Sequence, residues 1–155
     1  MKHYPYGILE PAKIPEIADG ILDEFFQIAG QVKIRAFLVF GLCLGFVRDG
    51  GYIEGDNDLD VGVICSEESK DRLINSLKEN GFNQGKSCRH NNTHFYKNKI
   101  LVDIYFRESG EFYSKFDSVQ YKGKQYPTPS PIEGYLSACY SNWKIKEDKA
   151  TQYYG

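Results

Sequence analysis

The fold of this chain is decided by the stretch Gly41-Leu-Cys-Leu-Gly45-Phe-Val-Arg48-Asp-Gly-Gly-Tyr-Ile-Glu-Gly-Asp56-Asn-Asp58-Leu-Asp60-Val. It follows Arg35–Phe40, a short run of aromatic and β-branched residues that predicts a buried strand. Gly41 ends that strand, and residues 42–47 predict a short helix. Leu59–Ile64 then predicts a second strand, with acidic residues at its start. The stretch therefore indicates two strands joined by a short helix and an acidic turn.

The acidic residues of this stretch alternate along the predicted strand. Residues two apart on a strand point to the same face, about 6.6 to 6.8 Å apart, so Asp58 and Asp60 project together while Leu59 and Val61 point the other way. Two close carboxylates repel, and each has a raised pKa unless a cation lies between them. A hard divalent cation such as Mg²⁺, or Mn²⁺ in its place, removes that repulsion. Asp56 continues the alternation and is a further candidate metal ligand.

A third carboxylate lies in the apolar run Ile100–Phe106, which predicts another strand. An unpaired charge is costly in such a setting. If this strand lies beside Leu59–Ile64, Asp103 completes a cluster that can bind metal and accept a proton from an attacking hydroxyl. The alternative is a solvated acidic turn at residues 56–60 and a salt-bridged Asp103. The upstream glycines, taken together with Asp103, favour the metal site.

The remaining pattern predicts one α+β (mixed α/β) domain over residues 1–155, with an irregular arm at 1–14 and a loose tail at 146–155. Apolar residues at spacings of three and four predict a helix from Pro15 to near Gly30. Ser66 is a candidate N-cap for a helix that ends at Asn80-Gly81. Further predicted elements are strands at 82–86, 93–96 and 100–106, a meander at 112–126, and a last helix at 132–142.

Composition limits the classes of function. The chain has 19 basic and 21 acidic residues, a formal charge of −2, which argues against a dedicated nucleic-acid binder. No apolar run reaches the roughly 18 residues of a membrane span, and the first residues lack the apolar stretch of a secretory signal. We therefore expect a cytoplasmic protein, of undetermined oligomeric state.

Cysteine and histidine offer weaker candidates. Cys43 and Cys65 stand among apolar neighbours, which indicates small core residues. Cys88 and His90, with His94 nearby, could form a zinc site, but the four cysteines include no C-x-x-C pair. His90 or His94 would compete with Asp103 as a catalytic base, although neither has an identifiable orienting partner. The basic residues of 86–99 are better explained by a solvated hairpin than by a phosphate clamp.

The quoted stretch resembles the signature of the LicD/fukutin family, roughly G-T-L-L-G-x-x-R, a short glycine-bearing turn, and I-P-W-D-D-D-I-D. Pro131-Ile-Glu133-Gly-Tyr135-Leu136, followed by Tyr140-Ser-Asn-Trp143, is similar to a second block of the family, P-x-x-x-E-x-Y-L and Y-G-x-x-W. The resemblance covers residues 20–145. Leu42 stands where the family has threonine, and Asn57 where it has aspartate.

This resemblance implies a nucleotidyltransferase-like mixed sheet flanked by helices. It also implies a Mg²⁺-dependent phosphotransferase that moves phosphocholine, ribitol phosphate or glycerol phosphate from a CDP-linked donor to a saccharide acceptor. Asp56, Asp58 and Asp60 would then hold the metal against the donor's diphosphate, and Asp103 would share the metal or activate the acceptor hydroxyl. The alternatives are a nucleotidyltransferase acting on a small molecule and a non-catalytic nucleotide-binding module.

Four upstream residues are candidates for binding the donor's phosphates. Gly41 and Gly45 permit close approach of the backbone, and the helix that carries them and Leu42 offers N–H groups to a phosphate. Arg48 either clamps a phosphate or pairs with Asp49 or Asp56.

Overall fold

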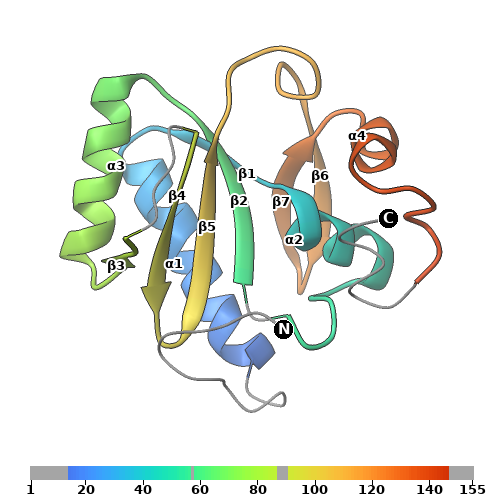
Figure 1. Ribbon diagram of the computed structural model, residues 1–155, viewed down its shortest axis with the longest axis horizontal. Coiled ribbons are helices and arrows are strands. Elements are labelled where there is room, and N and C mark those ends of the chain that lie inside the picture. Colours follow the sequence, from blue (N-terminus) through green and yellow to red (C-terminus); the bar gives the residue numbers. More distant parts are fainter. Residues whose placement is uncertain (1–13, 57, 87–90, 147–155) are drawn as a thin grey trace.

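A computed structural model describes residues 14–56, 58–86 and 91–146 of the chain (Figure 1). The predicted arm lies almost wholly outside these residues, as does the predicted tail. The helices are α1 (Ile14–Gln31), α2 (Phe40–Leu44), the π-helical turn η1 (Gly45–Asp49), α3 (Glu67–Glu79) and α4 (Ile132–Cys139). The strands are β1 (Arg35–Leu38), β2 (Asp58–Ile64), β3 (Asn83–Gln84), β4 (Asn92–Lys97), β5 (Ile100–Phe106), β6 (Phe116–Tyr121) and β7 (Lys124–Pro129).

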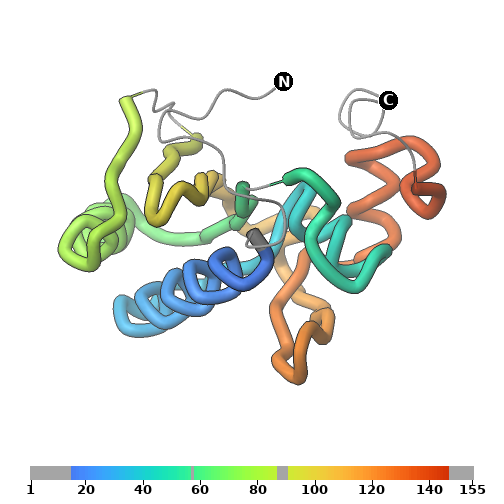
Figure 2. The backbone as a smooth tube through the Cα atoms, turned by 90° about the horizontal axis from the view of Figure 1, so that it is seen from below, coloured from blue at the N-terminus to red at the C-terminus, as the bar shows by residue number. Residues whose placement is uncertain are grey.

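The central element is a five-stranded mixed sheet in the order β1-β2-β5-β4-β3. Strands β2 and β5 are parallel, and the other neighbouring strands are antiparallel. Helices α1 and α3 lie on one face of this sheet, and the β6–β7 hairpin stands with α2 and α4 beside its β1 end (Figures 1 and 2). The prediction of a mixed sheet flanked by helices is confirmed.

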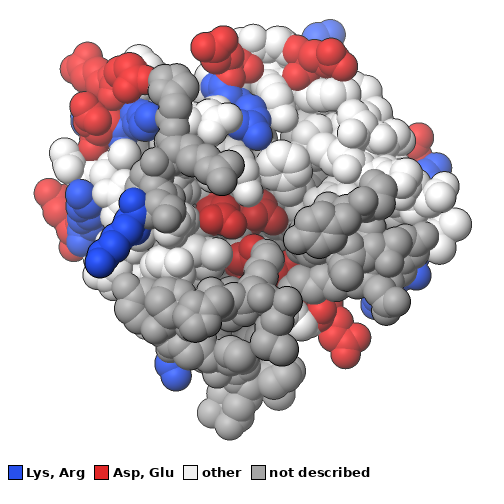
Figure 3. Space-filling view, in the orientation of Figure 1, with Lys and Arg blue, Asp and Glu red and all other residues white. Residues whose placement is uncertain are grey.

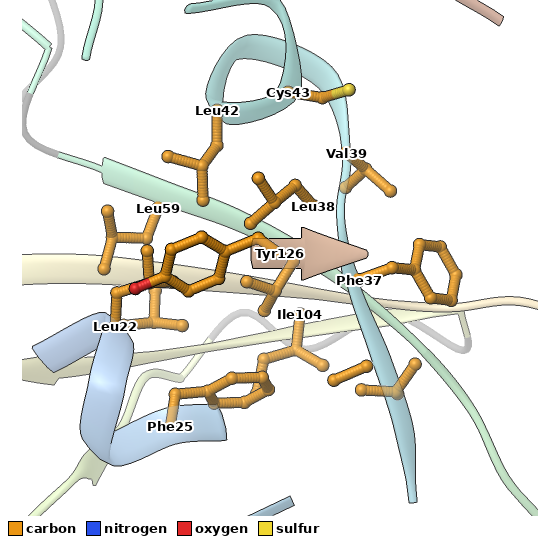
Figure 4. Close-up of a cluster of buried hydrophobic side chains, with 14 of the residues drawn as sticks. Leu22, Phe25, Phe37, Leu38, Val39, Leu42, Cys43, Leu59, Ile104 and Tyr126 are labelled. Atoms are coloured by element: carbon orange, nitrogen blue, oxygen red, sulfur yellow. The ribbon is translucent and has the colours of Figure 1, made fainter. Parts of the chain in front are cut away.

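The main core lies between the sheet and α1. Leu22 and Phe25 of α1 are fully buried against Leu59 of β2 and Ile104 of β5 (Figure 4). Complete burial of a side chain of this size stabilises the folded state by about 1.5–3 kcal/mol. This apolar packing requires one face of β2 and β5 to be hydrophobic, which directs the alternate residues of both strands to the opposite face.

The hairpin β6–β7 is attached to α1 through two carboxylates, Asp19 and Asp23. Phenol and ammonium groups donate to both of them. The contacts are Tyr52 Oη (2.6 Å), Tyr121 Oη (2.9 Å) and Lys122 Nζ (2.6 Å) to Asp19, and Lys124 Nζ (2.6 Å) and Tyr126 Oη (2.9 Å) to Asp23. Both carboxylates are therefore neutralised by side chains of the chain itself.

The structure corrects the predicted boundaries around the decisive stretch. The first strand ends at Leu38 instead of Phe40, because Phe40 adopts a left-handed conformation (φ 45°) and begins α2. Its N–H donates to Tyr135 Oη at 2.9 Å, which fixes the turn. The last helix ends at Cys139, before Asn142.

Other predictions agree with the structure. The Ser66 hydroxyl accepts the Ser69 N–H at 3.2 Å and caps α3 as expected. The strand predicted at residues 100–106 has the same bounds as β5. Within the described ranges, no helix combines the length and apolar character needed to cross a membrane.

Candidate active site

Three carboxylates converge on the face of the sheet opposite α1 and α3. The parallel register of β2 and β5 places Asp60 directly opposite Asp103, and Asp58 lies two residues before Asp60 on the same face. Each of the three offers a carboxylate oxygen within 4.8 Å of the others. In the space-filling view, acidic atoms gather near the centre of this face (Figure 3). The adjacency of the two strands, on which the predicted cluster depended, is confirmed.

The burial of these side chains follows from the alternation of β2. Leu59 and Val61 turn into the core, with exposed fractions of 1% and 0%, so Asp58 and Asp60 must face the other way. Both aspartates are nonetheless only 5% exposed. Helix α2 packs against β2, and Cys139 and Tyr140 at the end of α4 line the same cavity. Carboxylates packed together at that depth carry a high electrostatic cost in the absence of a cation.

The carboxylates form the floor of a cavity of about 350 Å³. Its remaining lining residues are three aromatic side chains and one thiol: Phe40, Tyr105, Cys139 and Tyr140. The Phe40 and Tyr105 rings meet edge to face, with centroids 4.9 Å apart. The cavity thus joins an acidic floor to an aromatic wall, a combination suited to a ligand with a charged part and a flat or apolar part.

The two phenols of this cavity have raised pKa values. Burial is the main cause for both, and the negative charges of Asp60, Asp103 and Asp58 add to it at Tyr105. At Tyr140 the second cause is the charge of Asp60. Both hydroxyls are therefore protonated at neutral pH and can donate hydrogen bonds. Burial also raises the pKa of the Cys139 thiol, which keeps it neutral.

The residues on this floor fit a divalent cation. All donors in the group are carboxylate oxygens, which hard cations such as Mg²⁺, Mn²⁺ and Ca²⁺ prefer. The strand register brings the three donors together without any rearrangement of the backbone. The acidic group can therefore bind a metal ion, and its oxygen donors do not by themselves select which one.

Asp56 lies beside this group but is not one of its three members. Its backbone N–H donates to Ile53 O at 3.0 Å, which closes the turn before β2, and its side chain is 7% exposed. The charge of Asp56 contributes to the raised pKa of Tyr140, a residue that lines the cavity. Its role as a ligand stays a prediction.

The three upstream candidates in the glycine-bearing stretch have different surroundings. Gly41 and Leu42 follow Phe40, a lining residue of the cavity, in the first turn of α2. The Leu42 side chain points into the core toward Leu38 (Figure 4), so only its backbone is available to a ligand. Gly45 has a packing role, because a Cβ there would lie 2.5 Å from Gly51 O.

Arg48 pairs with Asp49, which was one of the alternatives to a phosphate contact. Its Nε and Nη2 donate to the two carboxylate oxygens of Asp49 at 2.6 and 2.8 Å, and Nη1 donates to Trp143 O at 3.5 Å. This hydrogen bonding to Arg48 lowers the pKa of Asp49. Arg48 is not among the residues that line the cavity, and a phosphate could bind its guanidinium only by competing with Asp49.

Sequence reasoning missed the aromatic wall of the cavity. Tyr105 could have been found, because it lies two residues after Asp103 and must share its face. Phe40 and Tyr140 carry no comparable signal, since the turn at Phe40 and the end of α4 position them. His94 is the cross-strand neighbour of Asp103 on β4, with its ring over Gly85. Cys88 and His90, the other parts of the predicted zinc site, lie outside the described residues.

The fold and the carboxylate floor together define a nucleotidyltransferase-type domain. Residues 33–130 match the LicD/FKTN/FKRP nucleotidyltransferase-domain family, and the chain belongs to that family. The predicted family is therefore confirmed, and the second block of the resemblance, at residues 131–143, lies outside the matched range. Membership and fold together indicate an enzyme of the transferase class. Among curated proteins, none matches the chain.

Solved structures share the fold at low sequence identity. The lincosamide antibiotic adenylyltransferase LnuA, solved with lincomycin bound, superposes with a TM-score of 0.63 at 14% identity, over 86% of this chain and 92% of that one. The antibiotic-resistance factor ANT(2'')-Ia gives a TM-score of 0.59 at 10% identity, over 75% and 66% of the two chains. A Thermotoga maritima protein assigned to the nucleotidyltransferases gives 0.54 at 15% identity, over 88% of each. These likenesses establish the nucleotidyltransferase fold.

Proposed function

We propose that this protein is a Mg²⁺-dependent phosphotransferase that moves a phospho-alcohol from a CDP-linked donor to a saccharide acceptor. Phosphocholine, ribitol phosphate and glycerol phosphate are the candidate groups, and cell-surface polysaccharide modification is the proposed setting. The observation that carries the proposal is the pairing of Asp60 with Asp103 across β2 and β5, which gathers three carboxylates within 4.8 Å. Family membership supplies the reaction class.

Asp58, Asp60 and Asp103 would hold the cation, with Asp56 as a further candidate. When bound, a divalent ion neutralises charge on a phosphate group that is being transferred. The chain's own residues position the reactants around that point. An Asp103 carboxylate oxygen accepts the proton of the acceptor hydroxyl as that oxygen bonds to the phosphorus that carries the alcohol. The bond from this phosphorus to the bridging oxygen of the diphosphate breaks, and CMP leaves. The Tyr105 and Tyr140 hydroxyls, protonated at neutral pH, donate hydrogen bonds to ligand oxygens in the cavity.

The backbone at the start of α2 is the proposed contact for the donor. Gly41 and Leu42 present N–H groups next to Phe40, at the edge of the cavity. A backbone contact tolerates leucine at position 42, because its side chain is buried in the core. Arg48 would have to release Asp49 to contribute, so we assign it the smaller part.

A second candidate is transfer of a nucleotide monophosphate to a small molecule. The similarity to LnuA, an adenylyltransferase whose fold covers 86% of this chain, favours it. Both reactions would use the same carboxylates and differ in which phosphorus of the donor the acceptor attacks. Attack on the phosphorus that carries the alcohol transfers the phospho-alcohol and releases CMP, whereas attack on the phosphorus that carries the nucleoside transfers the nucleotide and releases the remaining phosphate part. Donors labelled in the cytidine or in the alcohol distinguish them, because only the transferred half appears in the acceptor product.

The deciding experiment is a melting-temperature screen of the whole chain against CDP-choline, CDP-ribitol, CDP-glycerol, CTP and ATP, each with and without Mg²⁺. A donor that binds the folded state raises the melting temperature by mass action. We expect a CDP-alcohol to do so only when Mg²⁺ is present. A nucleoside triphosphate that stabilises while no CDP-alcohol does would favour the second candidate. No response to any nucleotide would contradict both.

A further inference from the structure

Arg107 lies just beyond the cavity, on the strand side of its aromatic wall. Its backbone N–H donates to Val63 O at 2.9 Å, which continues the pairing of β2 and β5 past the last residue of β5. Its guanidinium carbon lies 5.3 Å from the Tyr105 ring centroid and 5.8 Å from that of Phe40. Both rings line the cavity, so the guanidinium lies beside its aromatic wall.

The electrostatic effect of Arg107 extends to the end of α4. The positive charge of Arg107 acts on Cys139, another lining residue, where it opposes the effect of burial on the thiol pKa. It acts in the same sense on Tyr105. Arg107 is thus within electrostatic range of both β5 and the end of α4, the two elements between which the cavity opens.

The negative charge of the cavity floor favours a positively charged side chain at the rim. The floor carries three carboxylates, and one divalent ion cancels only two negative charges. A substrate phosphate adds further negative charge, while no lysine or arginine is among the described residues that line the cavity. Binding of a phosphate there requires a cation from the rim.

Other cations near the cavity are already engaged. Arg48 forms its two-pronged pair with Asp49, and Lys144 lies 3.3 Å from a carboxylate oxygen of Glu133. For the guanidinium of Arg107, by contrast, the described part of the chain provides one hydrogen bond, from Nη1 to Phe106 O at 3.2 Å, and no ion pair. A guanidinium carries five N–H donors in one plane, so those not used in this hydrogen bond can bind an anion.

We propose that Arg107 binds a phosphate group of the substrate at the rim of the aspartate cavity and so makes the site selective for a phosphate-bearing ligand. This inference rests on the proposed function, since it assumes that a phosphate compound enters the metal site. The planar side chain, held against Tyr105 and Phe40, presents two parallel donors to two phosphate oxygens. Lysine at this position would keep the charge and lose that paired geometry.

The test uses two probes on the whole chain: Mn²⁺ alone, followed by electron paramagnetic resonance, and the Mn²⁺ complex of pyrophosphate, followed by calorimetry. We expect Arg107→Gln to bind Mn²⁺ as the wild type does and to lose about tenfold to hundredfold in affinity for the pyrophosphate complex. Arg107→Lys should give an intermediate loss. The wild-type affinity for the complex should fall with added salt more steeply than that of Arg107→Gln.

Arg72→Gln is the control, because Arg72 is an exposed arginine on α3, whose contacts are hydrogen bonds to Val32 O (3.4 Å) and Ser69 Oγ (3.1 Å) and an ion pair with Glu68 (4.0 Å). It should leave both affinities unchanged. Equal affinity for the pyrophosphate complex in the wild type and Arg107→Gln, with Mn²⁺ binding intact, would overturn this inference alone. A wild type that binds no Mn²⁺ would overturn the proposed function and this inference with it. If Arg107→Gln fails to fold, an unchanged affinity in Arg107→Lys would overturn it.

Discussion

Two pairs of aspartates in this molecule have the same chemistry and opposite surroundings. Asp19 and Asp23 on α1 accept hydrogen bonds from tyrosines and lysines of the neighbouring segments, which neutralise them. Asp58 and Asp60 on β2 lie next to Asp103, a third carboxylate, on the floor of a cavity that has no lysine or arginine among its described lining residues. The first pair joins parts of the fold, whereas the second pair concentrates like charge.

The difference separates stability from function. A carboxylate that receives donors from its own chain strengthens the folded state. Carboxylates held against one another weaken it unless a ligand supplies the opposite charge. Asp19 and Asp23, which join α1 to the β6–β7 hairpin (the α1 junction), should therefore be needed for stability but not for transfer. The three aspartates on the floor of the cavity should be needed for transfer but not for stability.

The largest expected effect is the loss of transfer in Asp103→Asn. We expect activity to fall by about 100-fold or more, because the substitution removes a metal ligand and the proposed proton acceptor. The melting temperature should stay the same or rise, since one repelling charge is lost. Transfer is measured with the donor that the melting screen identifies, and Asp58→Asn should behave similarly. Full activity in both variants would end the metal hypothesis.

Asp19→Asn should have the opposite effects, lowering the stability of the fold and leaving metal binding unchanged. We expect a loss of about 1–2 kcal/mol in the free energy of unfolding, a discounted value because Lys122 is 62% exposed and its ion pair is screened by solvent. Urea unfolding measures the loss, and Mn²⁺ affinity should not change. Asp71→Asn, an exposed position on α3, is the control and should alter neither quantity. If Asp19→Asn also lost Mn²⁺ binding, the two regions would not be independent.

Added metal ions should stabilise only a chain in which all three carboxylates of the cavity floor are present. At ten times the dissociation constant, Mg²⁺ or Mn²⁺ should raise the free energy of unfolding of the wild type by about 1.4 kcal/mol, or about 3–5 °C in melting temperature. Asp19→Asn should show the same increment and Asp103→Asn should show none. Chelation with EDTA should remove the increment, and an increment that persists in Asp103→Asn would place the ion elsewhere.

The smallest effect concerns alkaline pH and the α1 junction. Burial and the hydrogen bond to Asp19 raise the pKa of Tyr121. The folded chain then keeps a proton that the unfolded chain releases near pH 10, so this part of the stability is complete below about pH 10 and declines above it. Unfolding free energies at pH 8 and pH 11 should differ less in Asp19→Asn than in the wild type. An equal difference would exclude Asp19 as a cause.

Most elements of the fold could be predicted from local patterns. The period of α1, the Ser66 cap of α3 and the run that became β5 are all signals within one segment. The turn at Phe40 could not be predicted this way, because its conformation depends on a hydrogen bond to Tyr135, which lies far along the chain. Local chemistry therefore defines the segments, and long-range contacts set their ends.

The residues of the candidate site show the same difference between local signals and long-range contacts. Asp58 and Asp60 could be predicted as site residues from the alternation along a single strand. Asp103 could be added only on the condition that its strand lies beside theirs. For Arg48 the sequence left a phosphate and a nearby carboxylate as alternative partners, and in the structure Asp49 is the partner, through two hydrogen bonds. No sequence pattern pointed to Arg107, because its proposed role depends on contacts with aromatic rings of two different elements.

The parallel pairing of β2 with β5 has a consequence for folding. Between these two strands the chain must form α3, β3 and β4, and closing so long a loop costs entropy before its contacts are gained. The three ligands consequently meet only after that crossover has closed. A partly folded chain, even one with β1, α2 and β2 already in place, lacks part of the proposed metal site, so binding of an ion by all three carboxylates would report that the central sheet has been assembled.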